Sequence, residues 1–314
     1  MSDVTAQFGH GHAHGKAVLI GEHAVVYGFP AIALPMPMVN VVVRMTTTQG
    51  EDWLSSKYYR GPLATLPREL DGIRIIVDLS RAMLDGPSSG ITVDIHSTIP
   101  GGYGLGSSAA VAVALARAVY DLHGEPLSSE DLFTLVQAAE TSAHGMPSGI
   151  DTWATSTDRP IWFVRDRPPE PLHLVQPLFF VVASSNKPGS TRDTVRQVRE
   201  GQAPRDSGAG PMERLGVLTR AARWSLERGD YVQVGALMTE AHRELQRLQV
   251  ATAHIDQLVA TALQHGALGA KLTGGGAGGS IIALADDERH QARLSHALAA
   301  MGARQVWAPT MEVQ

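Results

Sequence analysis

The chain has 314 residues, a formal net charge of −5 and no cysteine. Its apolar fraction of 44% and charged fraction of 18% exclude disorder over the whole chain. The acidic balance opposes nucleic-acid binding, and the lack of cysteine excludes disulfides, thiolate catalysis and cysteine zinc sites. The length favours two domains, and a proline-rich piece at residues 167–171 suggests a boundary, so we expect domains over residues 1–175 and 176–314.

The N-terminal part of the chain predicts strands followed by a helix. Residues 17–20 and 39–45 are apolar runs, the second rich in β-branched side chains, and both favour strands. Periodicity is lost over residues 51–67, which we expect to be mostly exposed, whereas residues 73–84 have helical spacing. Apolar and polar residues alternate over 91–95, as in a half-buried strand.

Three histidines alternate near the N-terminus. His10, His12 and His14 would share one face of a strand, where imidazoles can bind a metal ion. Because no cysteine or carboxylate accompanies them, we interpret them as part of a polar N-terminal strand.

Two uncharged stretches, at residues 24–43 and 95–116, resemble membrane helices in hydropathy alone. Prolines interrupt the first and glycines the second, so we expect no membrane span. Residues 1–14 lack a basic region followed by an apolar stretch, so we expect no secretory signal and a cytoplasmic location.

The rest of the chain alternates helical and strand patterns. A glycine at position 124 is a stop signal for the helix before it, and the serines at 128 and 129 are a start signal for the next. The expected elements are helices over 107–122 and 131–143, a strand over 179–183, helices over 212–228, 231–249 and 255–265, a strand, a glycine loop over 274–279, a strand over 280–284 and a last helix.

A glycine-rich loop at residues 100–106 joins the strand at 91–95 to the next helix. Its glycines let backbone N–H groups approach a ligand, and the helix that follows offers the positive end of its dipole. We therefore expect a phosphate there, with Ser107 and Ser108 within reach of it or of its metal; a tight turn without ligand is the alternative. The common G-x-x-x-x-G-K-[ST] loop is absent, so a nucleotide would use another loop.

One carboxylate falls on an apolar helix face. Glu140 continues the stripe of Leu132 and Val136, so it should point inward. A buried carboxylate costs several kcal/mol unless it is paired or binds a metal, and both a salt bridge and a metal role stay open.

Two further segments carry polar groups that suit catalysis. Residues 144–151 form a turn that presents Ser148 and Asp151, although an ordinary helix-to-strand connection is the alternative. Lys16 begins an apolar strand, where lysines are usually solvated. In combination, a base, a metal-binding carboxylate, a lysine and a phosphate loop are the parts that phosphoryl transfer needs.

Three segments resemble, in order, the three signature motifs of the GHMP kinase family. They are GKAVLIGEHAVVYG at residues 15–28, IPGGYGLGSSAA at 99–110 and KLTGGGAGG at 271–279. The first motif and HGMPSGID at 144–151 are similar to those of the members that phosphorylate mevalonate. The motifs extend over nearly the whole chain, and their joint occurrence in order is highly specific.

The resemblance implies an α+β fold with an N-terminal ribosomal-S5-like domain, a C-terminal ferredoxin-like domain and an active site in the cleft between them. It also implies transfer of the γ-phosphate of ATP, with Mg²⁺, to the 5-hydroxyl of mevalonate. The family is compatible with a homodimer, although no stripe in this sequence identifies an interface.

The family roles carry over position by position. Asp151 matches the catalytic aspartate, which acts as the base, and Lys16 matches the lysine that interacts with it and with the reacting hydroxyl. Ser108 and Glu140 match the Mg²⁺ ligands. The substrate- or nucleotide-side positions are Glu22, His23, Ser148 and Thr191, and the nucleotide-binding positions are Pro100, Gly101, Gly102, Gly104, Leu105, Gly106, Ser107, Ser108 and Ala109.

Two departures and several alternatives accompany the resemblance. Tyr103 stands where alanine is common, which could alter the nucleotide pocket, and residues 274–279 read GGGAGG where GAGGGG is commoner. Phosphomevalonate kinases and other small-molecule GHMP kinases are the nearest alternatives. A non-catalytic ligand sensor of the same fold is the alternative from another class, but it should have lost Lys16, Glu140 or Asp151, and all three are present.

Overall fold

The computed structural model describes residues 7–84, 90–145, 147–189, 194, 196–198 and 210–313. The chain forms two compact units that are interleaved along the sequence. The first unit comprises Met1–Gly15, Val39–Pro100 and Gly106–Ser156, and the second comprises Lys16–Met38, Gly101–Leu105 and Thr157–Gln314. The domains expected over residues 1–175 and 176–314 divide the chain once, whereas these units alternate along it, so the expected boundary stays a prediction.

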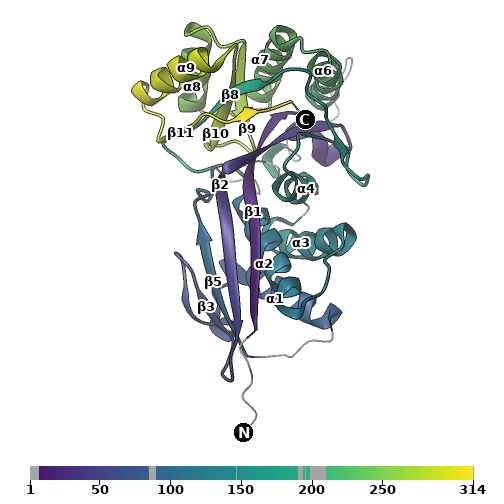
Figure 1. The fold of residues 1–314 in the computed structure, drawn as a ribbon. Coiled ribbons are helices and arrows are strands. Elements are labelled where there is room, and N and C mark those ends of the chain that lie inside the picture. Colours follow the sequence, from purple (N-terminus) through teal and green to yellow (C-terminus); the bar gives the residue numbers. More distant parts are fainter. Residues whose placement is uncertain are drawn as a thin grey trace. The chain divides into compact units, whose positions relative to one another are not determined.

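Two long strands contribute residues to both units (Figure 1). β1 (Phe8–Ile20) pairs with β2 (Ala31–Thr47), and each strand passes from one unit into the other. In the first unit β2 also pairs antiparallel with β5 (Ile91–Ser97), which pairs parallel with β3 (Trp53–Ser55), and β3 pairs antiparallel with β4 (Arg60–Pro62). The strands predicted at residues 17–20, 39–45 and 91–95 are confirmed, the first two as parts of longer strands.

The expectation of an exposed excursion over residues 51–67 is wrong in part. Two of its segments form β3 and β4, and Leu54 in the middle of β3 is completely buried. Strands of three residues are too short to show a period, so only pairing with β5 reveals them. Two short 3-10 helices follow, Leu63–Thr65 and Arg68–Leu70.

Buried glycines alternate with the histidines near the N-terminus. Gly9 and Gly11 are buried and His10 and His12 are exposed. A Cβ at Gly11 would lie 1.8 Å from the backbone oxygen of Ala114, so glycine is required where β1 packs directly on a helix. The polar-strand interpretation is confirmed for His10 and His12, whereas His14 is buried.

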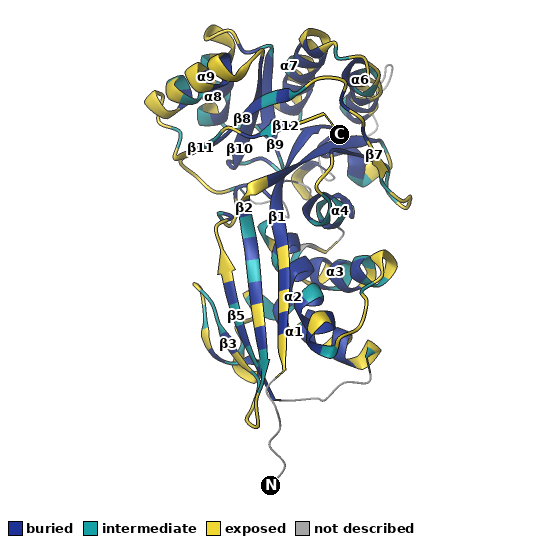
Figure 2. Ribbon diagram, in the orientation of Figure 1, coloured by how far each residue is buried: buried dark blue, intermediate teal, exposed yellow. Residues whose placement is uncertain are grey.

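Helices pack against one another in the first unit (Figure 1). They are α1 (Asp71–Met83), α2 (Ser107–His123), α3 (Ser129–His144) and α4 (Ile150–Ser156), and α2 contacts the other three. α2 is buried along most of its length, as its alanine-rich sequence allows, and it ends at Gly124 in the left-handed conformation at φ 68°. The predicted helices are confirmed, and Figure 2 shows the buried α2 beside strands with alternating exposure.

The second unit contains a second antiparallel sheet with helices packed on it. Besides parts of β1 and β2, the elements described in this unit are 3-10 helix Ala24–Tyr27, β6 (Ile161–Phe163), β7 (Glu170–Pro171), β8 (Leu178–Ser184), α6 (Pro211–Leu226), α7 (Tyr231–Arg247), α8 (Ala253–Gln264), β9 (Gly269–Thr273), β10 (Ser280–Ala285), α9 (Glu288–Ala300), β11 (Gln305–Trp307) and β12 (Thr310–Met311). The strand order of the second sheet is β11-β8-β10-β9 with β12 added to β8, and the helices α7, α8 and α9 contact its strands.

α7 lies unusually close to β9. A Cβ at Gly269 would lie 1.9 Å from the backbone oxygen of Gly235, and a Cβ at Gly235 would lie 2.2 Å from the oxygen of Leu268. Two facing glycines therefore let the helix backbone approach the strand backbone, which brings α7 side chains within reach of β9.

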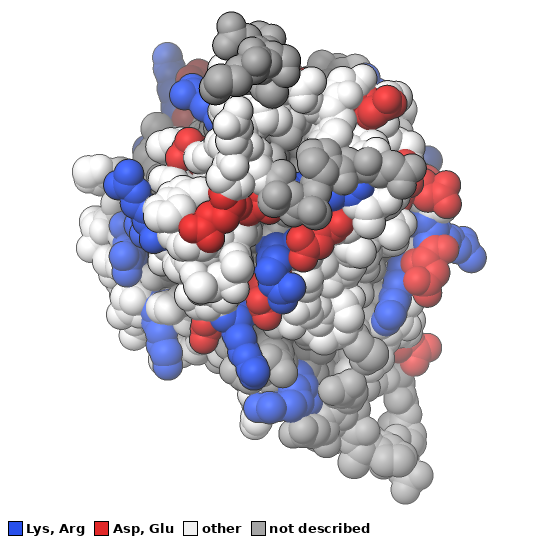
Figure 3. All heavy atoms as spheres, turned by 90° about the horizontal axis from the view of Figure 1, so that it is seen from below, with Lys and Arg blue, Asp and Glu red and all other residues white. Residues whose placement is uncertain are grey.

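On the face shown in Figure 3, Lys and Arg side chains are interspersed with Asp and Glu, so this face carries mixed charge. None of the helices within the described ranges combines the length and apolar character needed to cross a bilayer. Residues 24–43 instead form a 3-10 turn and the first part of β2.

Candidate active site

The predicted phosphate loop has the backbone conformation for which its glycines were expected. Gly102, Gly104 and Gly106 have φ values of 83°, 75° and 74°, which side-chain-bearing residues rarely adopt. A Cβ at Gly104 would also lie 3.0 Å from the backbone oxygen of Thr273. The glycines thus serve both the turn and a close approach to the end of β9, where the third motif begins.

Backbone groups hold this loop in place within the second unit. The oxygen of Gly102 accepts a hydrogen bond from the Gly189 N–H at 2.8 Å, and the oxygen of Tyr103 accepts one from Ser280 Oγ at 2.9 Å. The oxygen of Leu105 accepts from the Lys16 N–H at 3.0 Å. These three carbonyl oxygens of the loop accept hydrogen bonds from the protein. This is what we expect of a loop whose N–H groups bind a ligand.

Tyr103, the departure from the family pattern, is a buried residue of this loop. Its side chain is 5% exposed, and the Arg304 guanidinium lies 5.8 Å from the ring centroid. The ring therefore packs in the second unit.

In the first unit, the start of α2 meets the inward-facing carboxylate. Ser108, in the first turn of α2, donates a hydrogen bond to Glu140 Oε1 on α3 at 2.5 Å. Glu140 is 5% exposed, which confirms that it points inward, whereas Ser108 is exposed. The pair places two oxygen atoms together at a helix N-terminus, where the helix dipole favours an anion.

Asp151 lies in the first turn of α4 and is half-buried. α4 is fixed against α3, since Thr152 Oγ1 donates to Gln137 Oε1 at 3.2 Å and the rings of Phe133 and Trp153 stack at 5.2 Å. The interpretation of residues 144–151 as a plain turn is therefore incomplete, because its end is helical.

Ser148 lies just before α4. Its Oγ accepts from the Ile150 N–H at 3.4 Å, and the side chain is half-buried. Met146 in the same segment and Thr191, predicted on the substrate side, lie outside the described residues.

Lys16 lies inside β1 rather than at the start of a strand, because β1 begins at Phe8. Its side chain is 3% exposed, so the usual solvated lysine is excluded. The polar strand predicted at the histidines and the apolar run at 17–20 form one continuous strand, so Lys16 lies between them.

Glu22 forms a buried ion pair with Lys271. Lys271 Nζ on β9 donates both to Glu22 Oε1 and to the backbone oxygen of Leu272, and the Lys271 side chain is completely buried. Burial raises the pKa of the Glu22 carboxyl and lowers the pKa of the Lys271 ammonium, and their mutual attraction opposes both shifts. The Glu22 carboxylate is thus paired with a lysine of the same chain.

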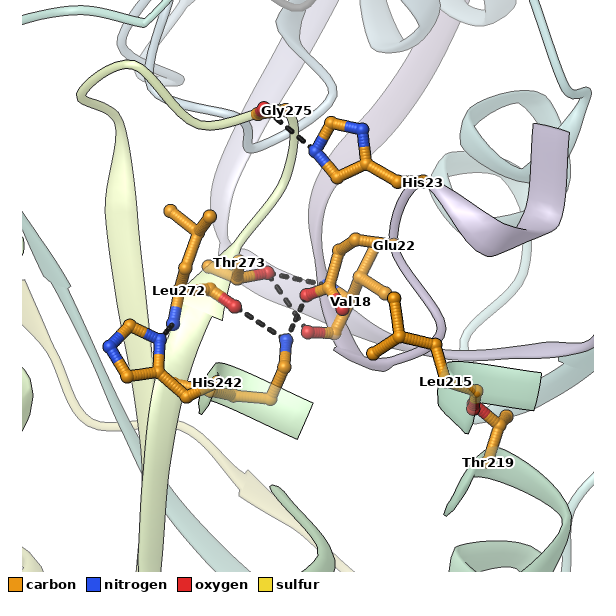
Figure 4. Close-up of polar contacts among 10 residues, drawn as sticks. Val18, Glu22, His23, Leu215, Thr219, His242, Leu272, Thr273 and Gly275 are labelled. Carbon is orange, nitrogen blue, oxygen red and sulfur yellow. Dashed lines mark hydrogen bonds and ion pairs between the residues drawn. The ribbon is translucent and has the colours of Figure 1, made fainter. Parts of the chain in front are cut away.

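The residues on either side of this pair connect the first motif to the third (Figure 4). Thr273 Oγ1 accepts from the Val18 N–H at 2.8 Å and donates to the Val18 oxygen at 3.0 Å. His23 Nε2 donates to the Gly275 oxygen at 3.0 Å, and burial lowers the pKa of His23 to about 4. His23 also has φ 60°, so this bond and the turn fix it together.

Segments of the three motifs therefore meet in the second unit: residues 16–28, the loop 101–105 and residues 271–279. Reasoning from the sequence missed Lys271, Thr273 and His242, which hold these segments together. The signal for His242 was its place on an apolar helix face, between Met238 and Leu245.

Family models match both halves of the chain. The GHMP kinases N terminal domain matches residues 73–157 and the GHMP kinases C terminal model matches residues 222–304. The mevalonate kinase of Thermococcus gammatolerans is 34% identical over 301 residues, which cover 89% of this chain and 90% of that protein. The chain belongs to the GHMP kinase family. It is an ATP-dependent small-molecule kinase by family, and the predicted α+β fold is confirmed.

Solved structures of GHMP kinases share the fold. The L. major mevalonate kinase in complex with R-mevalonate has a TM-score of 0.82 and 26% identity, covering 98% of this chain and 96% of that one. The Streptococcus pneumoniae phosphomevalonate kinase in complex with phosphomevalonate and AMPPNP has a TM-score of 0.81 at 16% identity, covering 96% and 99%. Fold similarity alone therefore does not separate the two acceptors, whereas sequence identity favours the mevalonate kinases.

Proposed function

We propose that this GHMP kinase transfers the γ-phosphate of ATP to the 5-hydroxyl of mevalonate and yields 5-phosphomevalonate. The observation that carries the proposal is the identity of 34% to a mevalonate kinase over nearly the full length of both chains. The segment at residues 144–151, with its Ser148 and Asp151, supports the same acceptor.

Asp151 is the proposed base, which accepts the proton of the mevalonate hydroxyl as the new P–O bond forms. Its place in the first turn of α4 and its partial exposure leave the carboxylate on a rigid element within reach of a ligand. Lys16 is the proposed partner that stabilises the developing alkoxide, as a positive charge does most strongly in a buried position.

Ser108 and Glu140 are the proposed holders of Mg²⁺. A hydroxyl and a carboxylate oxygen 2.5 Å apart are hard donors of the kind that Mg²⁺ prefers, and Mg²⁺ commonly takes one or two carboxylates with phosphate oxygens. The residues present therefore fit the ion, whose chemistry is to offset charge on the phosphates when bound.

The glycine loop and the start of α2 are the proposed ATP site. The hydrogen bonds accepted by its carbonyls at Gly102, Tyr103 and Leu105 fix the loop, which supports a role in holding phosphate. Glu22, His23, Ser148 and Thr191 remain the proposed substrate-side residues, with Glu22 acting from within its pair with Lys271. The homodimer, the cytoplasmic location and the absence of nucleic-acid binding stay predictions.

A coupled ADP-release assay tests the acceptor directly. Purified enzyme with Mg-ATP is assayed with mevalonate, phosphomevalonate, galactose and homoserine at matched concentrations. We expect turnover with mevalonate alone. Turnover only with phosphomevalonate would replace the acceptor, and no turnover with any of the four would favour the ligand-sensor alternative.

A further inference from the structure

A histidine outside the three motifs contacts Leu272, which lies on β9 and within the third motif. His242 lies on α7, is 4% exposed and points towards β9 (Figure 4). Its Nδ1 accepts a hydrogen bond from the Leu272 N–H at 3.3 Å, and its Nε2 lies 3.0 Å from Asp256 Oδ1 on α8. The ring therefore joins two helices to the backbone of β9.

The backbone groups of Leu272 need partners because β9 is the end strand of its sheet among the described strands. Leu272 lies opposite Ile281 of β10, but its N–H bonds to His242 and its oxygen to Lys271 Nζ, so both groups point away from β10. Side chains thus close the free edge of β9 at this one residue.

The tautomer of His242 follows from its partners. A backbone N–H can only donate, so Nδ1 carries no proton and Nε2 donates to Asp256. Asp256 Oδ1 also accepts from Gln246 Nε2 at 2.8 Å, which fixes the carboxylate from a second side chain of α7. Burial, the main cause, lowers the pKa of His242 and keeps the ring neutral.

Leu272, to which His242 bonds, lies two positions before the loop at residues 274–279. Thr273 bonds to Val18, the oxygen of Gly275 accepts from His23, and Gly274 packs against the backbone of Gly104. A shift of the Leu272 peptide would therefore be passed directly to contacts with both other motifs.

We propose that His242 is a positioning residue of this kinase: with Asp256 behind it, it fixes the Leu272 peptide and thereby the loop at residues 274–279 against the phosphate loop. The kinetic consequence rests on the proposed function. The effect on the position of the loop does not rest on the proposed function, so the structural and the kinetic prediction can fail separately.

His290 provides a matched control in the same unit. It lies on α9 and is 6% exposed; its Nδ1 accepts from the Asp286 N–H at 3.2 Å, and its Nε2 lies 3.2 Å from the His265 oxygen. It thus makes the same kind of bonds as His242, but they connect segments outside the three motifs. A general loss of stability should follow from replacing either histidine.

Hydrogen exchange over residues 269–280 is the first experiment, on the full chain without ligands. We expect H242L to exchange these amides at least tenfold faster than the unchanged protein, and H290L to leave them within twofold. H242N should restore slow exchange, because asparagine Oδ1 can take the place of Nδ1 as acceptor. Equal acceleration in H242L and H290L, or none in either, would overturn the proposal. If H242L does not fold, H242Q replaces it, since its longer amide reaches towards Asp256 instead of Leu272.

Steady-state kinetics on the same variants is the second experiment. We expect H242L to raise the KM for ATP at least fivefold with a smaller change in kcat, H290L to leave KM within twofold, and H242N to restore it. Equal KM values in H242L and H290L would overturn the positioning role. If the unchanged protein phosphorylates no mevalonate, the proposed function fails, and the exchange experiment still decides the role of His242.

Discussion

In the first unit Ser108 and Asp151 lie in the first turns of helices and keep access to solvent, and Glu140 lies on a neighbouring helix. In the second unit Glu22, His23 and Lys271 are buried. Glu22 pairs with Lys271, whose Nζ also donates to the backbone oxygen of Leu272, and His23 bonds to the backbone oxygen of Gly275. The first arrangement suits groups that must reach a ligand. The second suits groups that hold loops in place, because a buried polar group is stable only when its partners are fixed.

This comparison predicts that replacement in the first unit removes chemistry and leaves the fold. We expect Asp151→Asn to lower kcat by about 10²- to 10⁴-fold, the usual contribution of a general base, with ATP binding within a few-fold. The check is kcat together with calorimetric ATP affinity. Asp78→Asn on the surface of α1 is the control, with unchanged kcat. Normal turnover of D151N would remove Asp151 as the base.

Replacement of the buried pair in the second unit should instead act on stability. Lys271→Met leaves Glu22 as an unpaired buried charge, so we expect a loss of about 3–5 kcal/mol in unfolding free energy. The double variant with Glu22→Gln removes both charges and should recover a large part of that loss. Urea denaturation of the single and double variants measures the coupling. Additive losses would mean that the two side chains do not depend on each other.

His23, one of the buried histidines of the second unit, makes stability depend on pH. The pKa of His23 is about 4 in the folded protein and about 6.5 in the unfolded chain, so the unfolded state binds more protons between these values. Stability contributed by neutral His23 is therefore present above pH 6.5 and is lost as the pH falls towards 4, by about 2–3 kcal/mol at pH 4.5.

Urea unfolding at pH 7.0, 5.5 and 4.5 measures this loss in the unchanged protein and in His23→Asn. Asparagine does not titrate in this pH range, and its side chain is close to that of histidine in the position of its first polar atom. We expect the variant to show the flatter pH dependence. Parallel curves for the two proteins would contradict the assignment to His23.

An exposed ion pair in the first unit should show the smallest effect. Arg74 lies 3.2 Å from Asp71 and 3.7 Å from Asp78 on α1, with its side chain 46% exposed. Because water and salt screen such pairs, we expect Arg74→Ala to cost at most about 0.5 kcal/mol. Thermal unfolding in low and high salt measures it, and a loss as large as that of K271M would erase the contrast between buried and exposed pairs.

Much of the fold was predictable because long elements carry their period in the sequence. The spacing at residues 73–84 and the alternation at 91–95 identified α1 and β5, and Gly124 identified the end of α2. Short elements such as β3, β6 and β11 were not predictable, since three residues contain no period and form only by pairing with a neighbour.

The candidate site, too, was predictable from the sequence only in part. The inward direction of Glu140 followed from its helical stripe, and its contact with Ser108 links residues 32 positions apart. Lysines at strand starts are usually solvated, but Lys16, predicted as a catalytic residue, is buried, because β1 begins nine residues before the apolar run at 17–20.

The sequence by itself determined the identity of the motifs, the glycines of the loops and the direction of the amphipathic helices. These depend on backbone conformation and periodicity, which neighbouring residues set. Only the tertiary structure decided that Glu22 pairs with Lys271, 249 positions away, and that His242 holds Leu272. Such partners are chosen by packing, as when Gly235 and Gly269 let α7 approach β9, and no local pattern records which distant backbone group will need a bond.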